Sequence, residues 1–138
     1  MSVSFIILTH HDIGQQMVNV VEETLATSCP SMTALSVYPD QPIEQLIGQV
    51  ELQRAAFDDG DGVIIFTDLY GATPGNIACR LLEIPSIRVI TGVNLPMLLK
   101  AQSYADLPLD ELAEKVIEGG QQGIILCNKD ICQISSSS

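Results

Sequence analysis

The sequence predicts an α/β fold, a three-layer sandwich in which helices cover both faces of a mostly parallel sheet. Short apolar segments alternate along the chain with longer segments of helical periodicity. The run Val63–Thr67 is apolar on both faces, which is typical of a parallel strand covered on both sides. The connections between apolar runs are long enough to hold crossover helices. With 138 residues, 46% of them hydrophobic, the chain can form one domain with its own core.

The first half of the chain is predicted to contain three strands joined by two helices. The expected strands are Val3–Thr9, Thr33–Tyr38 and Val63–Thr67. Asp12 is expected to cap the first helix, with Gln15 three residues later completing a capping box. Pro42 suits the first turn of the second helix. Apolar residues then recur at helical spacing, at Ile43, Leu46, Ile47 and Val50.

The second half continues the same alternation. The expected elements are a helix from Pro74 through Leu82, a strand Ile87–Ile90, a helix around Met97 and Leu98, a helix Leu109–Glu118 and a strand Gly123–Cys127. This last strand could join the sheet antiparallel, and its terminal position makes exchange between two copies in a swapped dimer plausible. Residues 1–130 are expected to form one domain, and residues 131–138 a disordered tail.

The composition excludes several classes of function. The chain has 6 Lys and Arg against 17 Asp and Glu, a net charge of −11, so nucleic acids and anionic membranes should repel it. A protein partner would present basic or apolar surface. No apolar run is long enough to cross a membrane, and the first one lacks the features of a signal peptide, so a cytoplasmic location is expected. The four cysteines lack zinc spacing and are expected to be reduced and mostly buried.

Two strand ends carry the residues best suited to chemistry. His10 follows the first predicted strand and Asp68 follows the third, and parallel strands end at the same edge of a sheet. A carboxylate on one ring nitrogen fixes the histidine tautomer and frees the other nitrogen to attack a phosphoryl group. Strand alternation does not settle whether His10 or His11 faces Asp68, and Asp12 could pair with either ring. A metal held by these side chains is less favoured, because adjacent histidines rarely reach one ion.

The segment after Asp68 is suited to holding a phosphate. Thr73 is expected to be the N-cap of a helix that begins at Pro74. The N–H groups of Gly75 and Asn76 would then be available to an anion, assisted by the helix dipole. Gly71 would keep the loop backbone approachable. These residues predict a phosphate-binding loop that needs no metal or cofactor.

Three motifs in this order resemble one known family. They are the Thr9-His10 pair, the loop from Asp68 to Asn76, and the segment Thr91-Gly92-Val93-Asn94-Leu95-Pro96-Met97-Leu98. From Val3 to about Lys129 the chain resembles the mannose-type enzyme IIA domain of the bacterial phosphoenolpyruvate-dependent sugar phosphotransferase system. The resemblance implies an α/β sandwich, commonly a homodimer that exchanges its last strand.

The resemblance also implies a function for the site. His10 would take a phosphoryl group from the phosphocarrier HPr and pass it to a IIB partner on a separate chain, while Asp68 orients its ring. Contact with a membrane would be indirect, through transporter components. The sequence departs from the family pattern at Thr73, where serine is usual, and at His11, where a small residue is usual. His11 therefore stands as a possible second acceptor.

Other functions remain open at this point. A regulatory sensor of phosphorylation state, binding a kinase or a transcription regulator without a transport role, would use the same histidine. A receiver phosphorylated on Asp68, with Lys129 nearby, is less favoured because receivers need an acidic pair after the first strand. A dihydroxyacetone-kinase donor subunit is a relative, but the segment from Val93 to Leu98 is closer to the sugar type. The sequence does not indicate which sugar is involved.

Overall fold

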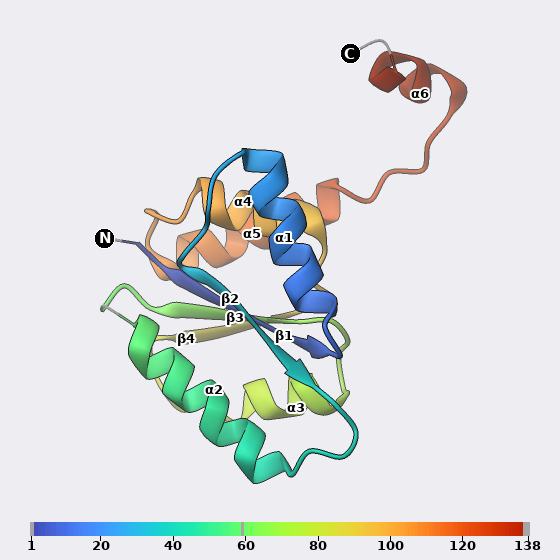
Figure 1. The fold of residues 1–138 in the computed structure, drawn as a ribbon. Coiled ribbons are helices and arrows are strands. Elements are labelled where there is room, and N and C mark those ends of the chain that lie inside the picture. The colour runs from blue at the N-terminus through green and yellow to red at the C-terminus, as the bar shows by residue number, and fades with distance from the viewer. Residues whose placement is uncertain (1, 59, 137–138) are drawn as a thin grey trace.

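The structure is a computed structural model that describes residues 2–58 and 60–136, with side chains described as far as Cys132. Within these residues the chain forms four strands and six helices (Figure 1). The strands are β1 (Ser4–His10), β2 (Met32–Val37), β3 (Val63–Thr67) and β4 (Ile87–Thr91). The helices are α1 (Ile13–Leu25), α2 (Ile43–Phe57), α3 (Thr73–Cys79), α4 (Leu95–Ser103), α5 (Leu109–Gln122) and α6 (Lys129–Ser136).

The four strands form one parallel sheet in the order β2-β1-β3-β4. Helices α1, α4 and α5 cover one face, and α2 and α3 cover the other (Figure 1). Alternate residues of β1 enter opposite cores: Phe5 and Ile7 pack towards α1, α4 and α5, whereas Ile6 and Leu8 pack towards α2 and α3. Each such side chain is almost fully buried, which contributes roughly 1.5–3 kcal/mol to stability. The predicted α/β sandwich is confirmed.

Helix α1 begins differently from the prediction. Asp12 occupies the N-cap position, but its carboxylate accepts a hydrogen bond from Gln16 Nε2 (3.4 Å) and does not cap the helix. The buried hydroxyl of Thr9 serves the first turn instead, accepting from the Gly14 N–H at 2.8 Å. A Cβ on Gly14 would lie 2.9 Å from Ile7 Cγ2, so only glycine allows this approach. The start of α1 is thereby fixed to the end of β1.

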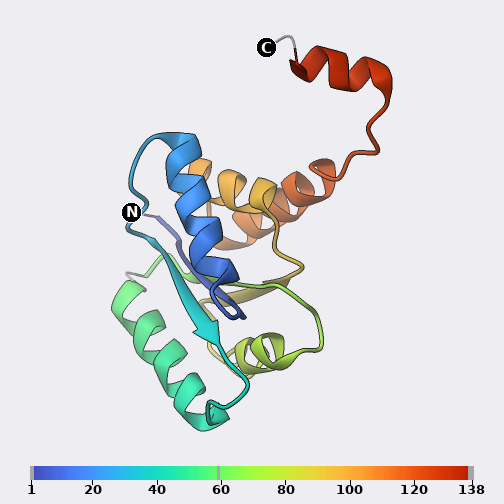
Figure 2. The same cartoon turned by 45° about the vertical axis from the view of Figure 1, so that its right-hand side comes forward.

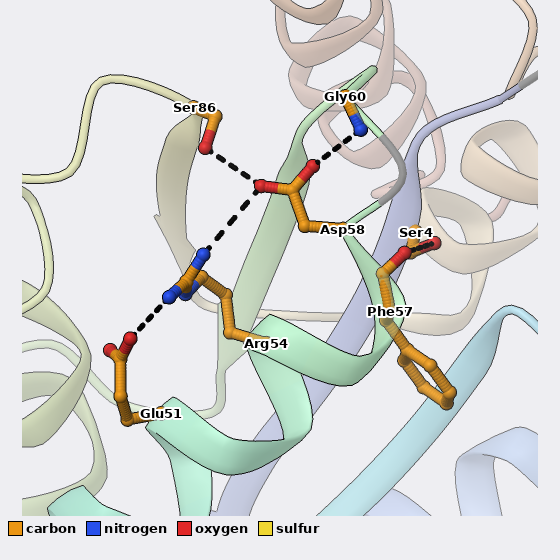
Figure 3. A network of polar contacts seen from close by, with 7 residues as sticks. All are labelled: Ser4, Glu51, Arg54, Phe57, Asp58, Gly60 and Ser86. Atoms are coloured by element: carbon orange, nitrogen blue, oxygen red, sulfur yellow. Dashed lines mark hydrogen bonds and ion pairs between the residues drawn. The ribbon is translucent and has the colours of Figure 1, made fainter.

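A polar network closes the opposite end of the sheet (Figure 3). Asp58, just after α2, accepts hydrogen bonds from the Gly60 N–H and the Ser86 hydroxyl, both at 2.9 Å. Arg54 pairs with Asp58 at 3.8 Å and also donates to Glu51. The hydrogen bond from the Gly60 N–H, followed by those from Ser86 and Gly62 and the charge of Arg54, lowers the pKa of Asp58 despite its partial burial. This network links the end of α2 to the turns that precede β3 and β4.

The segment predicted as a fifth strand is not a strand in the structure. Gly123 ends α5 in a turn, and residues 124–128 form neither helix nor strand. The side chains of Ile124, Ile125 and Leu126 are 76%, 59% and 94% exposed. In both views the chain leads away from the sheet here (Figures 1 and 2), so its apolar residues find no neighbouring strand within one chain. Antiparallel addition and exchange with a second copy stay predictions.

One further expectation for the second half needs correction. Helix α3 ends at Cys79, short of Leu82, because the chain tightens into turns with i to i−3 hydrogen bonds, such as Leu82 N–H to Cys79 O (3.2 Å). Helix α6 lies in the segment that was expected to be a disordered tail. Ser137 and Ser138 fall outside the described residues, and the division into a domain and a tail stays a prediction.

The cysteines are free but not mostly buried. Only Cys29 is buried, and that burial, followed by the charge of Glu22, raises the pKa of its thiol. Cys79, Cys127 and Cys132 are exposed, because the first ends a short surface helix and the others lie in the segment that leaves the sheet. None of the helices in the described part of the chain is long and apolar enough to cross a membrane.

Candidate active site

The site lies where the order of the strands reverses. From β1 the chain passes to β2 on one side, and β3 then returns to the other side of β1. Helices α1 and α3, which follow β1 and β3, lie on opposite faces of the sheet (Figure 1). The carboxyl ends of β1 and β3 therefore border a crevice, the place where open α/β sheets bind ligands. His10 is the last residue of β1, and Asp68 directly follows β3.

One oxygen of Asp68 holds both the backbone and the ring of His10. Asp68 Oδ2 accepts from the His10 N–H at 3.0 Å and lies 2.9 Å from His10 Nδ1. A carboxylate can only accept, so Nδ1 carries a proton, and in the neutral ring Nε2 then holds the lone pair. The Asp68 side chain is 17% exposed and that of His10 is 41% exposed. The ring is thus fixed on its inner side and accessible on its outer side.

His11 takes no part in this pair. It adopts a left-handed backbone conformation (φ 52°), and its N–H donates to Val37 O at 2.9 Å. Its ring packs against Tyr38, with 5.1 Å between ring centroids. Among the described residues, His11 forms neither a hydrogen bond nor an ion pair with Asp68. Geometry therefore favours His10 as the histidine that a carboxylate orients.

The loop after Asp68 reaches the helical conformation one residue earlier than predicted. Ala72, not Thr73, is the N-cap of α3, and no side chain caps this helix. The Asn76 N–H donates to Ala72 O at 2.9 Å, so it is not available to an anion. The N–H groups of Thr73 and Gly75 have no acceptor among the described residues. Gly71 has a φ of 80°, a conformation that favours glycine.

Two pockets open beside His10 and the loop. A pocket of about 370 Å³ is lined by His10, His11 and Thr73, together with Val37, Tyr38, Pro39, Gln41, Ile43 and Leu46. A smaller pocket of about 140 Å³ is lined by Tyr70, Gly71, Gly75, Asn76, Cys79 and Thr91. The predicted phosphate-binding residues are therefore divided: Thr73 shares a pocket with His10, whereas Gly71, Gly75 and Asn76 line the neighbouring one.

Sequence reasoning overlooked several features around the site. Leu69 and Tyr70 are 59% and 82% exposed. The sequence signal for this exposure was the presence of large apolar residues inside a glycine-containing loop. Thr67 Oγ1 and Asp68 Oδ1 are buried without a hydrogen-bond partner among the described residues. Nothing in the sequence pattern indicated this. Across all residues that the structure describes, no three His, Cys, Asp or Glu side chains gather into a possible metal site.

The fold and the site define a class: an α/β protein with a carboxylate-oriented histidine at the switch point of a parallel sheet. Residues 4–117 match the sequence model of the EIIA-man family, described as the fructose IIA component of the phosphotransferase system. Because the match covers most of the chain, the protein belongs to this family of IIA components.

Individual relatives agree with this assignment. The mannose-specific EIIAB component of Escherichia coli K12 is 29% identical over 127 residues, which are 90% of this chain but 39% of that protein. The mannose/sorbose-specific IIA subunit from Enterococcus faecalis superposes with a TM-score of 0.81 at 21% identity, covering 93% of this chain and 96% of that chain. A sigma-54 interaction domain protein from Enterococcus faecalis gives 0.66 at 19% identity, covering 88% and 92%. These two structures show a shared fold alone.

Proposed function

We propose that the protein carries phosphoryl groups within a sugar phosphotransferase system, accepting them from phospho-HPr on His10 and passing them to a IIB partner. The single observation that carries the proposal is the 2.9 Å contact between His10 Nδ1 and Asp68 Oδ2, in a member of the EIIA-man family. This contact leaves the outer ring nitrogen free, and it lies at an accessible edge of the sheet.

The transfer needs no proton to leave or enter. The Nε2 lone pair of His10 attacks the phosphorus while the bond between phosphorus and the donor's ring nitrogen breaks, and that bonding pair returns to the donor. His10 then carries the phosphoryl group on Nε2 and keeps its proton on Nδ1, so its ring becomes positive. Asp68 stabilises this charge and holds the ring in place. Transfer to the IIB partner reverses the same step.

Thr73 and the loop complete the proposed phosphate site. Thr73 lines the same pocket as His10, and its hydroxyl makes no hydrogen bond within the described residues. The N–H groups of Thr73 and Gly75 are further available donors, and Gly71 and Asn76 line the adjoining pocket. Phosphoryl oxygens carry most of the charge during transfer, so donors at these positions would stabilise it.

The proposal extends to partners and assembly. HPr and a separate IIB chain would dock around the exposed side of His10, and basic or apolar surface on them would complement a chain of net charge −11. We expect a cytoplasmic homodimer that reaches the membrane only through transporter components. Segment 123–127 is the part expected to cross between subunits.

Labelling with phosphoenolpyruvate, enzyme I and HPr tests the central claim. His10→Ala should abolish labelling, whereas His11→Ala should reach nearly the same final labelling as the unaltered protein. The label should be lost in acid and retained in alkali, as for phosphohistidine. Equal labelling of His10→Ala would overturn the assignment, and a label lost in alkali would point to an acyl phosphate on Asp68.

A regulatory function would use the same histidine. The fold also occurs in the sigma-54 interaction domain protein, and a fold alone does not decide between transport and regulation. The two are separated by offering the phosphorylated protein a purified IIB chain. Rapid transfer to IIB supports the transport function, whereas a stable phosphoprotein that changes its affinity for a kinase or transcription regulator supports the sensor.

A further inference from the structure

His11 holds a backbone conformation that its side chain disfavours. It and Ala26 are the non-glycine residues with positive φ in the described part of the chain, at 52° and 55°. Ala26 is the C-cap of α1, where a left-handed residue commonly ends a helix. His11 follows a strand, where no such helix end explains it. Glycine would adopt this conformation freely, so a histidine here stores strain at the mouth of the site.

One contact anchors the backbone of His11 and another its ring. The backbone N–H of His11 donates to Val37 O at 2.9 Å, which fixes the turn to the end of β2. Its ring lies against that of Tyr38 at 5.1 Å between centroids and 52° between planes. His11 is thus anchored through its backbone and one ring contact, and it lines the pocket beside His10.

The imidazole is chemically available there. Its ring nitrogens have no hydrogen-bond partner among the described residues, whereas Nδ1 of His10 is occupied by Asp68. The pocket of about 370 Å³ is lined by His10, His11 and Thr73 among others. A group carried on His10 would therefore share this pocket with His11. A phosphoryl group spreads its charge over three oxygens and is stabilised by pre-positioned N–H donors.

We propose that His11 is a phosphoryl-binding residue, whose ring N–H donates a hydrogen bond to the group that His10 accepts. This inference rests on the proposed function of His10. The bond from phosphorus to the donor's nitrogen breaks and the bond to His10 Nε2 forms as before. His11 keeps its proton and makes no bond to phosphorus. We attribute the presence of histidine in this strained backbone conformation to that hydrogen bond.

Three variants test the proposal with phospho-HPr in single-turnover experiments. His11→Gly removes both the ring and the strain, and it should label His10 to the same final level about tenfold more slowly. That factor is the expected effect of losing one hydrogen bond to a charged group. The half-saturating concentration of phospho-HPr should not change. His11→Asn tolerates the left-handed conformation and keeps an N–H donor, so it should recover much of the rate.

Ala26→Gly is the matched control, since it relieves the same kind of strain far from the pocket. It should transfer at the normal rate and raise the melting temperature by about 2–4 °C. His11→Gly should melt within about 3 °C of the unaltered protein, because relief of strain offsets the lost contact with Tyr38. A normal rate in His11→Gly would overturn the proposal. So would a raised half-saturating concentration at an unchanged rate, which would assign His11 to partner docking.

Phosphoramidate, a small donor that phosphorylates histidine directly, separates this inference from the proposed function. If phospho-HPr fails to label the unaltered protein, the proposed function fails, and phosphoramidate still reports on His11. Slower labelling of His10 in His11→Gly than in Ala26→Gly would support the contact. Equal labelling of His10 in the two variants would refute it.

Discussion

Replacing Asp68 by asparagine separates the charge of this residue from its geometry. Asp68 Oδ2 accepts from both the backbone N–H and the ring of His10, at 3.0 and 2.9 Å. The carbonyl oxygen of asparagine can accept the same two hydrogen bonds, so the link between the ends of β1 and β3 should survive. The fold should therefore persist, and the main loss should be the negative charge beside the phosphorylated ring.

The size of that loss follows from the distance and the exposure. Two unit charges about 4 Å apart attract by about 4 kcal/mol at an effective dielectric constant of about 20. His10 is 41% exposed, so water screens part of this attraction, and about 3 kcal/mol is a reasonable value. Since about 1.4 kcal/mol corresponds to a factor of ten, transfer should slow by about 10²-fold. That factor lies within the usual range for a positioned acid, base or orienting group.

Single-turnover transfer from phospho-HPr, followed by rapid quenching, measures the rate. Asp12→Asn is the matched control, because it makes the same charge change at an exposed residue whose carboxylate contacts only Gln16 among the described residues. It should transfer at nearly the normal rate. Equal rates for Asp68→Asn and Asp12→Asn, with both proteins folded, would show that Asp68 only shapes the turn.

Three other substitutions or measurements address the loop, the polar network and the assembly. Thr73→Ser should transfer normally, whereas Thr73→Ala should slow transfer with an unchanged melting temperature, because Ala72 and not Thr73 occupies the cap; a large loss of stability would contradict this. The lowered pKa of Asp58 means that its ionised form adds stability, which is lost as the pH falls below about 4. The free energy of urea unfolding of Asp58→Asn should therefore vary less between about pH 5 and 2 than that of the unaltered protein. Parallel pH curves for the two proteins would refute the network's contribution. Light scattering on the full chain should give the mass of a dimer. A chain truncated before Gly123 should instead form monomers or aggregates. A clean 14.9 kDa species of the full chain at micromolar concentration would count against exchange of segment 123–127.

The sequence allowed the layers and the meeting of two strand ends to be predicted, because both depend on simple periodicities. Runs such as Val63–Thr67 are apolar on both faces only when helices cover both sides of the sheet. Parallel strands must end at one edge, so His10 and Asp68 were bound to lie near each other once the order of strands placed β1 beside β3. These features require no knowledge of individual contacts.

The choice between the two histidines required the backbone. Ile6 and Leu8 point into the core under α2 and α3, and His10 follows at the same alternation. That reasoning applies only while the strand continues, and His11 departs from it with a φ of 52°. A non-glycine residue in this conformation is uncommon, so no propensity rule predicts it. The alternation of side chains along β1 could not by itself show which of the two histidine rings contacts Asp68.

The errors at helix ends and at segment 123–127 have a shared physical origin. The first turn of α3 shifts by one residue because Asn76 bonds to Ala72, a choice between backbone partners of nearly equal energy. The fifth strand was predicted at the short apolar run of segment 123–127, but a strand exists only where a neighbouring strand supplies hydrogen bonds. The local sequence pattern indicates that a segment can form a strand, but not that a neighbouring strand is present in the same chain.

The site separates the residues that fix the position of His10 from those that can vary around it. Asp68 and the buried ends of β1 and β3 determine where His10 Nε2 lies, and a change there disturbs the ring and the strand ends together. Tyr38 and Tyr70 are exposed at the pocket walls, and neither contributes to the buried core. Substitutions at these walls can therefore alter transfer rates or partner choice at little expense of stability. Under the proposed function, this separation would let one fold keep its phosphoryl acceptor fixed while its surface adapts to different partners.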